Sequence, residues 1–323
     1  MNNEIKYIMP NFLCLGRNEI LISIYEKFKN VTRENTSIYS FYGSFPKAIW
    51  NGGRADLTED KSSYKFMKKV KKFYDKKGIT ITFTFTNPLI KEEHLNDEYC
   101  NKILEIFHNG KNEVLVVSPV LEKYIREKYP KYKINKSITF ADKQNPYDTD
   151  RYHLSVIDKH LNHKIDILKE IKEKEKIEIL CDEVCVNNCK YTKQHYTEIG
   201  HVQLGYMPTD PQYSNCRYFN KMPTYNHIAR RNKNSIYYIS PEDIQNIYAP
   251  MGFKYFKLSG REKWNFIGLE SIINYCIKPE YQMDVRTYIL ERMLLEAEKE
   301  FDYYLKTDPR YSEAIDNSNW QYI

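Results

Sequence analysis

The sequence has no stretch of the kind that carries a chain into or across a membrane. No run approaches the roughly 18 consecutive apolar residues that a transmembrane helix needs. No N-terminal segment combines a basic stretch, an apolar run of about 7–15 residues and a small-residue cleavage site, as a secretory signal peptide does. We therefore expect a cytoplasmic protein that does not act at a membrane.

Familiar catalytic motifs are missing as well. The sequence contains no G-x-S-x-G nucleophile elbow, no P-loop and no H-E-x-x-H zinc motif. It also lacks internal repeats of about 20–50 residues. These absences argue against the best-known classes of hydrolase and nucleotide-binding enzyme, and against a solenoid.

Composition sets looser limits. Charged residues make up 28% of the 323-residue chain and hydrophobic ones 41%, which is ordinary for a globular protein with a sizeable core. The formal net charge of +6 is mild for this length, and it permits an acidic partner such as RNA without requiring one.

Cysteine is scarce, but it is clustered. The chain has seven cysteines, too few for a disulfide framework at this length. Cys181, Cys185 and Cys189 follow one another with C-x3-C-x3-C spacing, and Cys216 comes next. Cytoplasmic thiols stay reduced, so close cysteines there favour metal binding or redox chemistry.

These four cysteines are the predicted metal ligands. A 4Fe-4S cluster usually takes four Cys thiolates, and Cys216 would be the fourth. Zinc accepts four thiolates too and commonly uses C-x2–4-C pairs, so a zinc site is an open alternative. Core packing without ligation is a third possibility, most applicable to Cys181 because it directly continues a predicted strand. The C-x3-C-x2-C motif of radical-SAM enzymes does not match, because the second gap is one residue longer.

The hydrophobic pattern indicates eight strands, most of them separated by helices. Regular β-then-α alternation implies parallel strands with crossover helices packed on the sheet. We therefore predict an α/β fold, a (β/α)8 TIM-type barrel over residues 1–280, with a C-terminal helical extension over 281–323 packed on the barrel. A doubly wound open sheet is the alternative. The predicted strands are 6–10, 37–43, 79–86, 114–117, 136–140, 152–156, 177–180 and 253–258.

Three further residues are weaker candidates for binding a substrate. Active sites of barrels lie where the strands end, and Arg54 follows the Gly52-Gly53 pair after the second strand, where an anion would fit. Arg261 follows the eighth strand, a region that often binds phosphate or carboxylate, although it is equally suited to pairing with Glu242. His195 follows the cysteines, either as a ligand or as a group that supports one.

The chain resembles the collagenase-like peptidase family, which includes accessory proteins of oxygen-independent ubiquinone hydroxylation and of tRNA uridine hydroxylation. The resemblance covers most of the chain. It rests on Glu183-x-Cys185-x3-Cys189 with His195 and Cys216, on Ser240-Pro241-Glu242-Asp243, and on Lys257-Leu258-x-Gly260-Arg261.

The resemblance implies a TIM-type barrel and, as in several members, a 4Fe-4S cluster held by four cysteines. Cys185, Cys189 and Cys216 are the best matches to those ligands. Some members place a ligand after the second strand, where this chain has Trp50 and Asn51. The fourth ligand is therefore open between Cys181 and another group.

The leading functional hypothesis is an iron–sulfur barrel protein, an enzyme or a subunit of one. It would act in or assist a hydroxylation or related modification of RNA or a small molecule, with a redox partner or a related barrel subunit. One alternative is a zinc-stabilised or metal-free barrel that binds a partner or peptide without catalysis. Another is a metal-assisted hydrolase or peptidase, although the sequence shows no Ser/His/Asp or H-E-x-x-H set for proteolysis.

Overall fold

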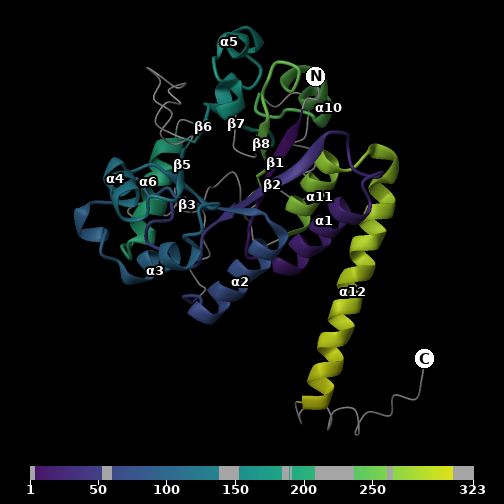
Figure 1. Ribbon diagram of the computed structural model, residues 1–323, viewed down its shortest axis with the longest axis horizontal. Helices are drawn as coiled ribbons and strands as arrows, with labels where there is room; N and C mark the ends of the chain where they lie inside the picture. Colours follow the sequence, from purple (N-terminus) through teal and green to yellow (C-terminus); the bar gives the residue numbers. More distant parts are fainter. Residues whose placement is uncertain are drawn as a thin grey trace.

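A curled sheet of eight parallel strands forms the centre of the molecule (Figure 1). The computed structural model describes residues 4–52, 60–137, 153–183, 189, 191–207, 236–259 and 265–307. Each strand pairs with the next along the chain, and β8 also pairs with β1. The strands are β1 (Ile5–Pro10), β2 (Thr36–Gly43), β3 (Thr80–Phe85), β4 (Glu113–Val116), β5 (Lys133–Lys136), β6 (Leu154–Val156), β7 (Ile177–Leu180) and β8 (Tyr255–Lys257).

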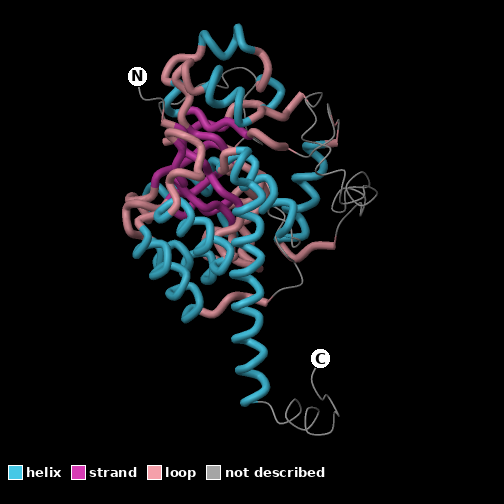
Figure 2. Tube along the Cα trace, turned by 90° about the vertical axis from the view of Figure 1, so that its right-hand side faces the viewer, coloured by secondary structure: helices cyan, strands magenta, loops and turns pink. Residues whose placement is uncertain are grey.

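Helices surround this sheet, as Figure 2 shows. They are α1 (Leu15–Lys27), α2 (Tyr64–Lys77), α3 (Glu98–Phe107), α4 (Pro119–Lys128), α5 (Ile165–Glu170), α6 (Thr192–Gln203), α10 (Pro241–Asp243), α11 (Asn265–Cys276) and α12 (Gln282–Thr307). Short 3-10 turns η1 (Glu92–His94), η3 (Lys159–Leu161), η4 (Lys174–Lys176) and η6 (Pro279–Tyr281) lie between them, and the π-helical turn η5 (Ile244–Tyr248) continues α10. None of the helices in this part of the chain is both long and apolar enough to cross a membrane.

The fold is thus a single α/β domain on a curled parallel sheet. A helix or helical turn follows each strand except β5, after which residues 138–152 lie outside the described part. The full (β/α)8 alternation therefore stays a prediction, as does the division at residue 280.

Local sequence signals account for the helix ends. Ser63 caps α2 by accepting a hydrogen bond from the backbone N–H of Phe66 at 3.2 Å. Gly78 ends the same helix in the left-handed region at φ 67°, a conformation that costs glycine least.

One predicted strand was misplaced. The fifth strand was expected over 136–140, but β5 spans Lys133–Lys136. The observed strand includes Ile134 and Asn135, which are both buried. The sequence around them alternates lysine with apolar residues. Alternating charge concealed a strand whose Asn135 side chain reaches the buried Glu113 carboxylate.

The two faces of the sheet differ in chemistry. Successive side chains of a strand point to opposite faces. In β7, Ile177 and Ile179 join the main hydrophobic core together with residues of the surrounding helices, whereas Glu178 between them lies on the inner face. A small apolar cluster of Ile8, Tyr42 and Leu154 lies apart from that core.

A buried carboxylate organises the polar groups at the amino end of the sheet. Glu113, the first residue of β4, is fully buried and accepts hydrogen bonds from Tyr39, from Asn135 at 2.8 Å and from Thr82 at 3.1 Å. His153 Nε2 lies 3.3 Å from the same carboxylate. Burial raises the pKa of Glu113, but the hydrogen bonds and the charge of His153 outweigh it, so that the pKa is lowered overall. In barrel-like folds the amino end serves stability, which suits this network.

Candidate functional site at the carboxyl ends of the strands

The ends of β7 and β8 are locked together by Asp182. Its carboxylate accepts a hydrogen bond from the Ser259 backbone N–H at 2.6 Å and another from the Ser271 hydroxyl of α11. Its carbonyl oxygen accepts the Ser259 hydroxyl at 2.8 Å. These bonds fix the point at which the chain leaves β7 for the cysteine segment.

Cys181 lies just before this lock and points into the hydrophobic core. It is fully buried with Ile177 and Ile179, and its carbonyl oxygen accepts hydrogen bonds from Ile239 N at 2.8 Å and the Tyr275 hydroxyl at 3.2 Å. Burial, followed by the nearby carboxylates, raises the pKa of the Cys181 thiol well above its ordinary value. This is the environment of a protonated core cysteine. Its role as a ligand is untested and stays a prediction.

Cys189 has a different environment. It is only partly buried, and its carbonyl oxygen accepts hydrogen bonds from Thr192 at the start of α6, from the hydroxyl at 2.9 Å and the N–H at 3.4 Å. Four further predicted site residues lie outside the described residues: Arg54, Cys185, Cys216 and Arg261.

The helix that follows Cys189 was not predicted from the sequence. α6 has few apolar residues at helical spacing and contains Gly200, which costs a helix about 1 kcal/mol relative to alanine. His195 lies in its first turns, partly exposed, with its ring against the edge of Tyr196 at 5.8 Å. No contact that we describe brings His195 to Cys189.

Tertiary contacts hold α6 in place across the carboxyl end of the sheet. The Asn87 amide, two residues beyond β3, donates a hydrogen bond to the Gly200 carbonyl oxygen at 3.2 Å. A Cβ at Gly200 would lie 2.6 Å from Asn87 Oδ1 and 3.2 Å from a Leu89 methyl carbon. β3 and β7 are four strands apart in the closed order, so these contacts place α6 far from the strand that precedes it in the chain. Figure 1 accordingly draws α6 on the side that holds α3 and α4.

The buried face of α6 carries an unsatisfied amide. Gln203 is 6% exposed, and neither Oε1 nor Nε2 has a hydrogen-bond partner among the described residues. Leaving such a group unpaired costs about 1–3 kcal/mol, so a polar partner at this position would stabilise the structure. The amide offers a bound molecule a carbonyl oxygen that accepts hydrogen bonds and an NH2 group that can donate two.

A buried ion pair faces the interior of the sheet beneath this edge. Lys257 Nζ lies 2.9 Å from Glu178 Oε1, with side chains 11% and 1% exposed. The ammonium also lies 4.4 Å from the centre of the Tyr42 ring, whose hydroxyl donates to the Leu258 carbonyl oxygen at 2.8 Å. Sequence reasoning missed this pair, although Glu178 interrupts an otherwise apolar strand and was a usable signal.

A second cation lies at the end of β6. Lys159 Nζ is 3.4 Å from Glu183 Oε2 and 4.6 Å from the centre of the Tyr237 ring. Glu183 directly follows Asp182 at the end of β7. The contact of Lys159 with Glu183 therefore joins the charged residues after β7 to the segment after β6.

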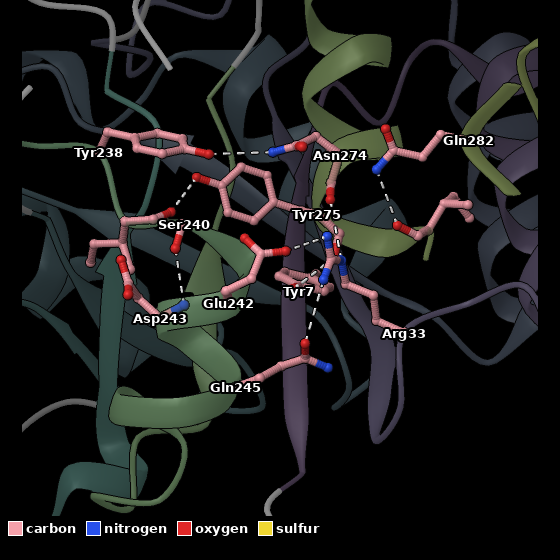
Figure 3. A network of polar contacts seen from close by, with 12 residues as sticks. Tyr7, Arg33, Tyr238, Ser240, Glu242, Asp243, Gln245, Asn274, Tyr275 and Gln282 are labelled. Atoms are coloured by element: carbon pink, nitrogen blue, oxygen red, sulfur yellow. Dashed lines mark hydrogen bonds and ion pairs between the residues drawn. The ribbon is translucent and has the colours of Figure 1, made fainter. Parts of the chain in front are cut away.

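The Ser240-Pro241-Glu242-Asp243 motif is structural in the described contacts (Figure 3). The Ser240 hydroxyl caps α10 by accepting the Asp243 N–H at 3.0 Å. Glu242 pairs with Arg33 at 2.8 Å, and Arg33 also donates to the Asn274 carbonyl oxygen at 3.3 Å. Arg33 lies in the loop before β2, so its bonds tie the amino end of that strand to α10 and α11. Glu242 thus pairs with Arg33; Arg261 lies outside the described residues, so its suggested pairing with Glu242 stays a prediction.

No group of three or more His, Cys, Asp or Glu side chains that would hold a metal ion is found within the described part of the chain. The predicted cysteine set is not tested by this result, because Cys185 and Cys216 are not among those residues.

No protein-family model matches the chain, and no solved structure matches it either. The chain is similar to a protein of Methanocaldococcus jannaschii named as an uncharacterized protease. The two are 23% identical over 305 residues, which cover 90% of this chain and 86% of that protein. The likeness weakly supports a peptidase-like family, and it adds nothing for an iron–sulfur cluster or for hydroxylation.

Proposed function

We propose that the protein binds an iron–sulfur cluster through the cysteine segment between β7 and α6, and that it acts in or assists the modification of RNA or a small molecule at the carboxyl ends of the strands. The observation that carries this proposal is the position of Cys189. Cys189 is partly exposed just before α6, the helix whose Gly200 contacts Asn87 beyond the carboxyl end of β3.

The described cysteines fit such a cluster unequally. Cluster ligands are thiolates, and the buried Cys181 thiol has its pKa raised well above the ordinary value. Cys189 has no such obstacle. In this proposal Cys185, Cys189 and Cys216 are the cysteine ligands, and the fourth ligand comes from a group other than Cys181.

The bound cluster would supply electron transfer or a site for substrate coordination. The protein's own groups would hold and orient the substrate. Gln203 offers an unpaired amide on the buried face of α6, and Lys257 offers a cation fixed by Glu178. An amide suits a nucleobase edge or a carbonyl, and an ammonium suits a carboxylate or phosphate.

Anaerobic purification tests the proposal. We expect iron and acid-labile sulfide in the purified protein, with the visible absorbance of a thiolate-bound cluster. Cys189→Ala should lose iron and sulfide. Cys181→Ala should keep both, because its side chain packs in the core, and Cys276→Ala, which removes another buried thiol, is the matched control. Stoichiometric zinc without sulfide, or no metal at all, would replace the proposal with a zinc-stabilised or metal-free binding protein.

A metal-assisted peptidase is the second candidate, because the Methanocaldococcus jannaschii relative is named as a protease. Purified protein would be incubated with a mixture of unstructured peptides with and without a chelator. Cleavage that the chelator abolishes and added metal restores would favour this candidate. Absence of cleavage by a protein with full iron and sulfide content would remove it.

A further inference from the structure

The final helix, α12, is held to the body by one face only. Val285 and Ile289 are buried in the main core, and the Tyr288 ring meets the edge of Phe28 at 5.7 Å. Arg286 forms a two-bond pair with Glu270 of α11, both bonds at 2.8 Å. Beyond this anchor the helix continues past the body of the protein, as both Figure 1 and Figure 2 show.

The opposite face of α12 exposes a row of large apolar side chains. Met283 is 68% exposed, Leu290 57% and Leu294 61%. At about 100° per residue, Leu294 lies about 180° around the helix from the buried Val285. Single exposed leucines are normal on a protein surface, but a contiguous row marks an interaction site.

The spacing of this row is that of a coiled-coil seam. Steps of four and three residues alternate along it over two heptads, from Met283 to Ala297, the pattern that two packed helices require. At about 1.5 Å per residue, the 26-residue helix is about 39 Å long, enough to present the whole seam. The seam consists of Met283, Thr287, Leu290, Leu294 and Ala297.

We propose that a second copy of this chain covers the seam, with the two α12 helices parallel. Asp284, Glu291 and Glu298 all follow seam residues on one flank, so an antiparallel pair would set acidic flanks against each other. A parallel pair instead places Arg286, on the other flank, beside Glu291 of the second copy. The pair with Glu270 uses two of the five guanidinium donors of Arg286. Because each body lies on the far side of its helix, the two bodies do not obstruct the pairing.

Size-exclusion chromatography with light scattering on the full chain, over a range of concentrations, tests this proposal. We expect wild type to reach twice the 38.8 kDa mass of the chain. The double variant Leu290→Glu/Leu294→Glu should be monomeric, and its circular dichroism should match wild type because glutamate favours helices. Leu295→Glu is the matched control. It changes an exposed leucine that lies about 100° from Leu294, outside the seam, and it should leave the dimer intact.

A wild-type protein that stays monomeric at about 100 µM overturns the proposal, since interfaces worth about 8 kcal/mol are half-formed near 1 µM. A dimer that survives the double variant overturns it as well. So does a monomer that co-sediments with phosphatidylcholine vesicles through the same leucines, because a membrane would then be the occupant. All these readouts are independent of metal content.

Glu291→Lys tests the orientation. In the parallel pair it replaces two symmetry-related attractions with repulsions, and the dimer should dissociate about tenfold more readily. In an antiparallel pair the same change would relieve the clash of acidic flanks and tighten the dimer, which would refute the parallel arrangement.

Discussion

Lys257→Met is the sharpest test of the polar interior. The substitution keeps the aliphatic stem of Lys257 and removes its charge, leaving the 1%-exposed Glu178 carboxylate without its cation. At 2.9 Å and an effective dielectric constant of about 20, the pair attracts with about 6 kcal/mol. Transfer of the two ions from water costs several kcal/mol each and offsets most of that attraction. The single variant removes the attraction and retains the desolvation of Glu178, so we expect it to lose about 3–5 kcal/mol of unfolding free energy.

The double variant Lys257→Met/Glu178→Gln separates charge from packing. It removes both ions, so it should regain about 2 kcal/mol or more relative to Lys257→Met alone. Urea unfolding followed by tryptophan fluorescence measures these differences, and the buried Trp50 reports on the core. Lys71→Met is the matched control. Lys71 pairs with Asp75 on the exposed surface of α2, so its loss should cost less than about 1 kcal/mol.

Two results would refute this reasoning. In the first, Lys257→Met lowers the unfolding free energy no more than Lys71→Met does. This would mean that the Glu178 carboxylate reaches water or another cation in the folded protein. A double variant no more stable than Lys257→Met would mean that packing of the lysine stem, rather than its charge, accounts for the loss.

Three further predictions follow from the described contacts. Because the pKa of Glu113 is lowered in the folded state, its network stabilises the protein above about pH 4.3, the ordinary glutamate value, and this contribution disappears as pH falls through the lowered pKa. Glu113→Gln should thus cost about 2–3 kcal/mol at neutral pH and progressively less in acid, measured by urea unfolding along a pH series; a cost independent of pH contradicts this. Gly52→Ala places a Cβ 1.9 Å from a backbone oxygen and should lower the unfolding free energy by more than about 3 kcal/mol. Its control, Gly16→Ala, meets nothing within 4 Å and should be tolerated. Equal thermal stability of the two variants would refute the clash. Gly200→Ala, whose Cβ would crowd Asn87, should speed hydrogen exchange in α6 at least tenfold with little change elsewhere, and unchanged exchange there would show that α6 is not held by this contact.

Most strands were predictable because each is marked by a short run of apolar residues within the strand itself. Seven of the eight predicted strands coincide with observed ones to within a few residues, since runs such as Val114-Leu115-Val116 admit few other structures when bounded by turn residues. β5 was shifted because its inward-facing Asn135 is polar, and polarity in a strand is normally a sign of solvent. The polar residues inside the sheet are thus the reason that β5 was hard to find from the sequence.

The site was less predictable, because its parts meet only through long-range contacts. The Lys257–Glu178 pair joins residues 79 positions apart, and the contact of Asn87 with Gly200 joins residues 113 positions apart. Nothing near Gly200 in the sequence indicates that a helix packs there, because the helix is stabilised by its docking rather than by its own propensity. The cysteine segment was visible in the sequence, but the side to which each thiol points was not.

The alternation of β7 bears on which cysteines could serve the cluster that we propose. Ile177 and Ile179 face the helices and Glu178 faces the interior, so Cys181, in phase with the isoleucines, is carried into the core. Asp182 then fixes the end of the strand through its bonds to Ser259 and Ser271. For the iron–sulfur cluster that we propose, we expect dependence on Cys185 and Cys189 and not on the buried Cys181. Asp182→Asn weakens the bonds to Ser259 and Ser271 without removing a cysteine, so it should lower the free energy of unfolding while leaving iron content unchanged.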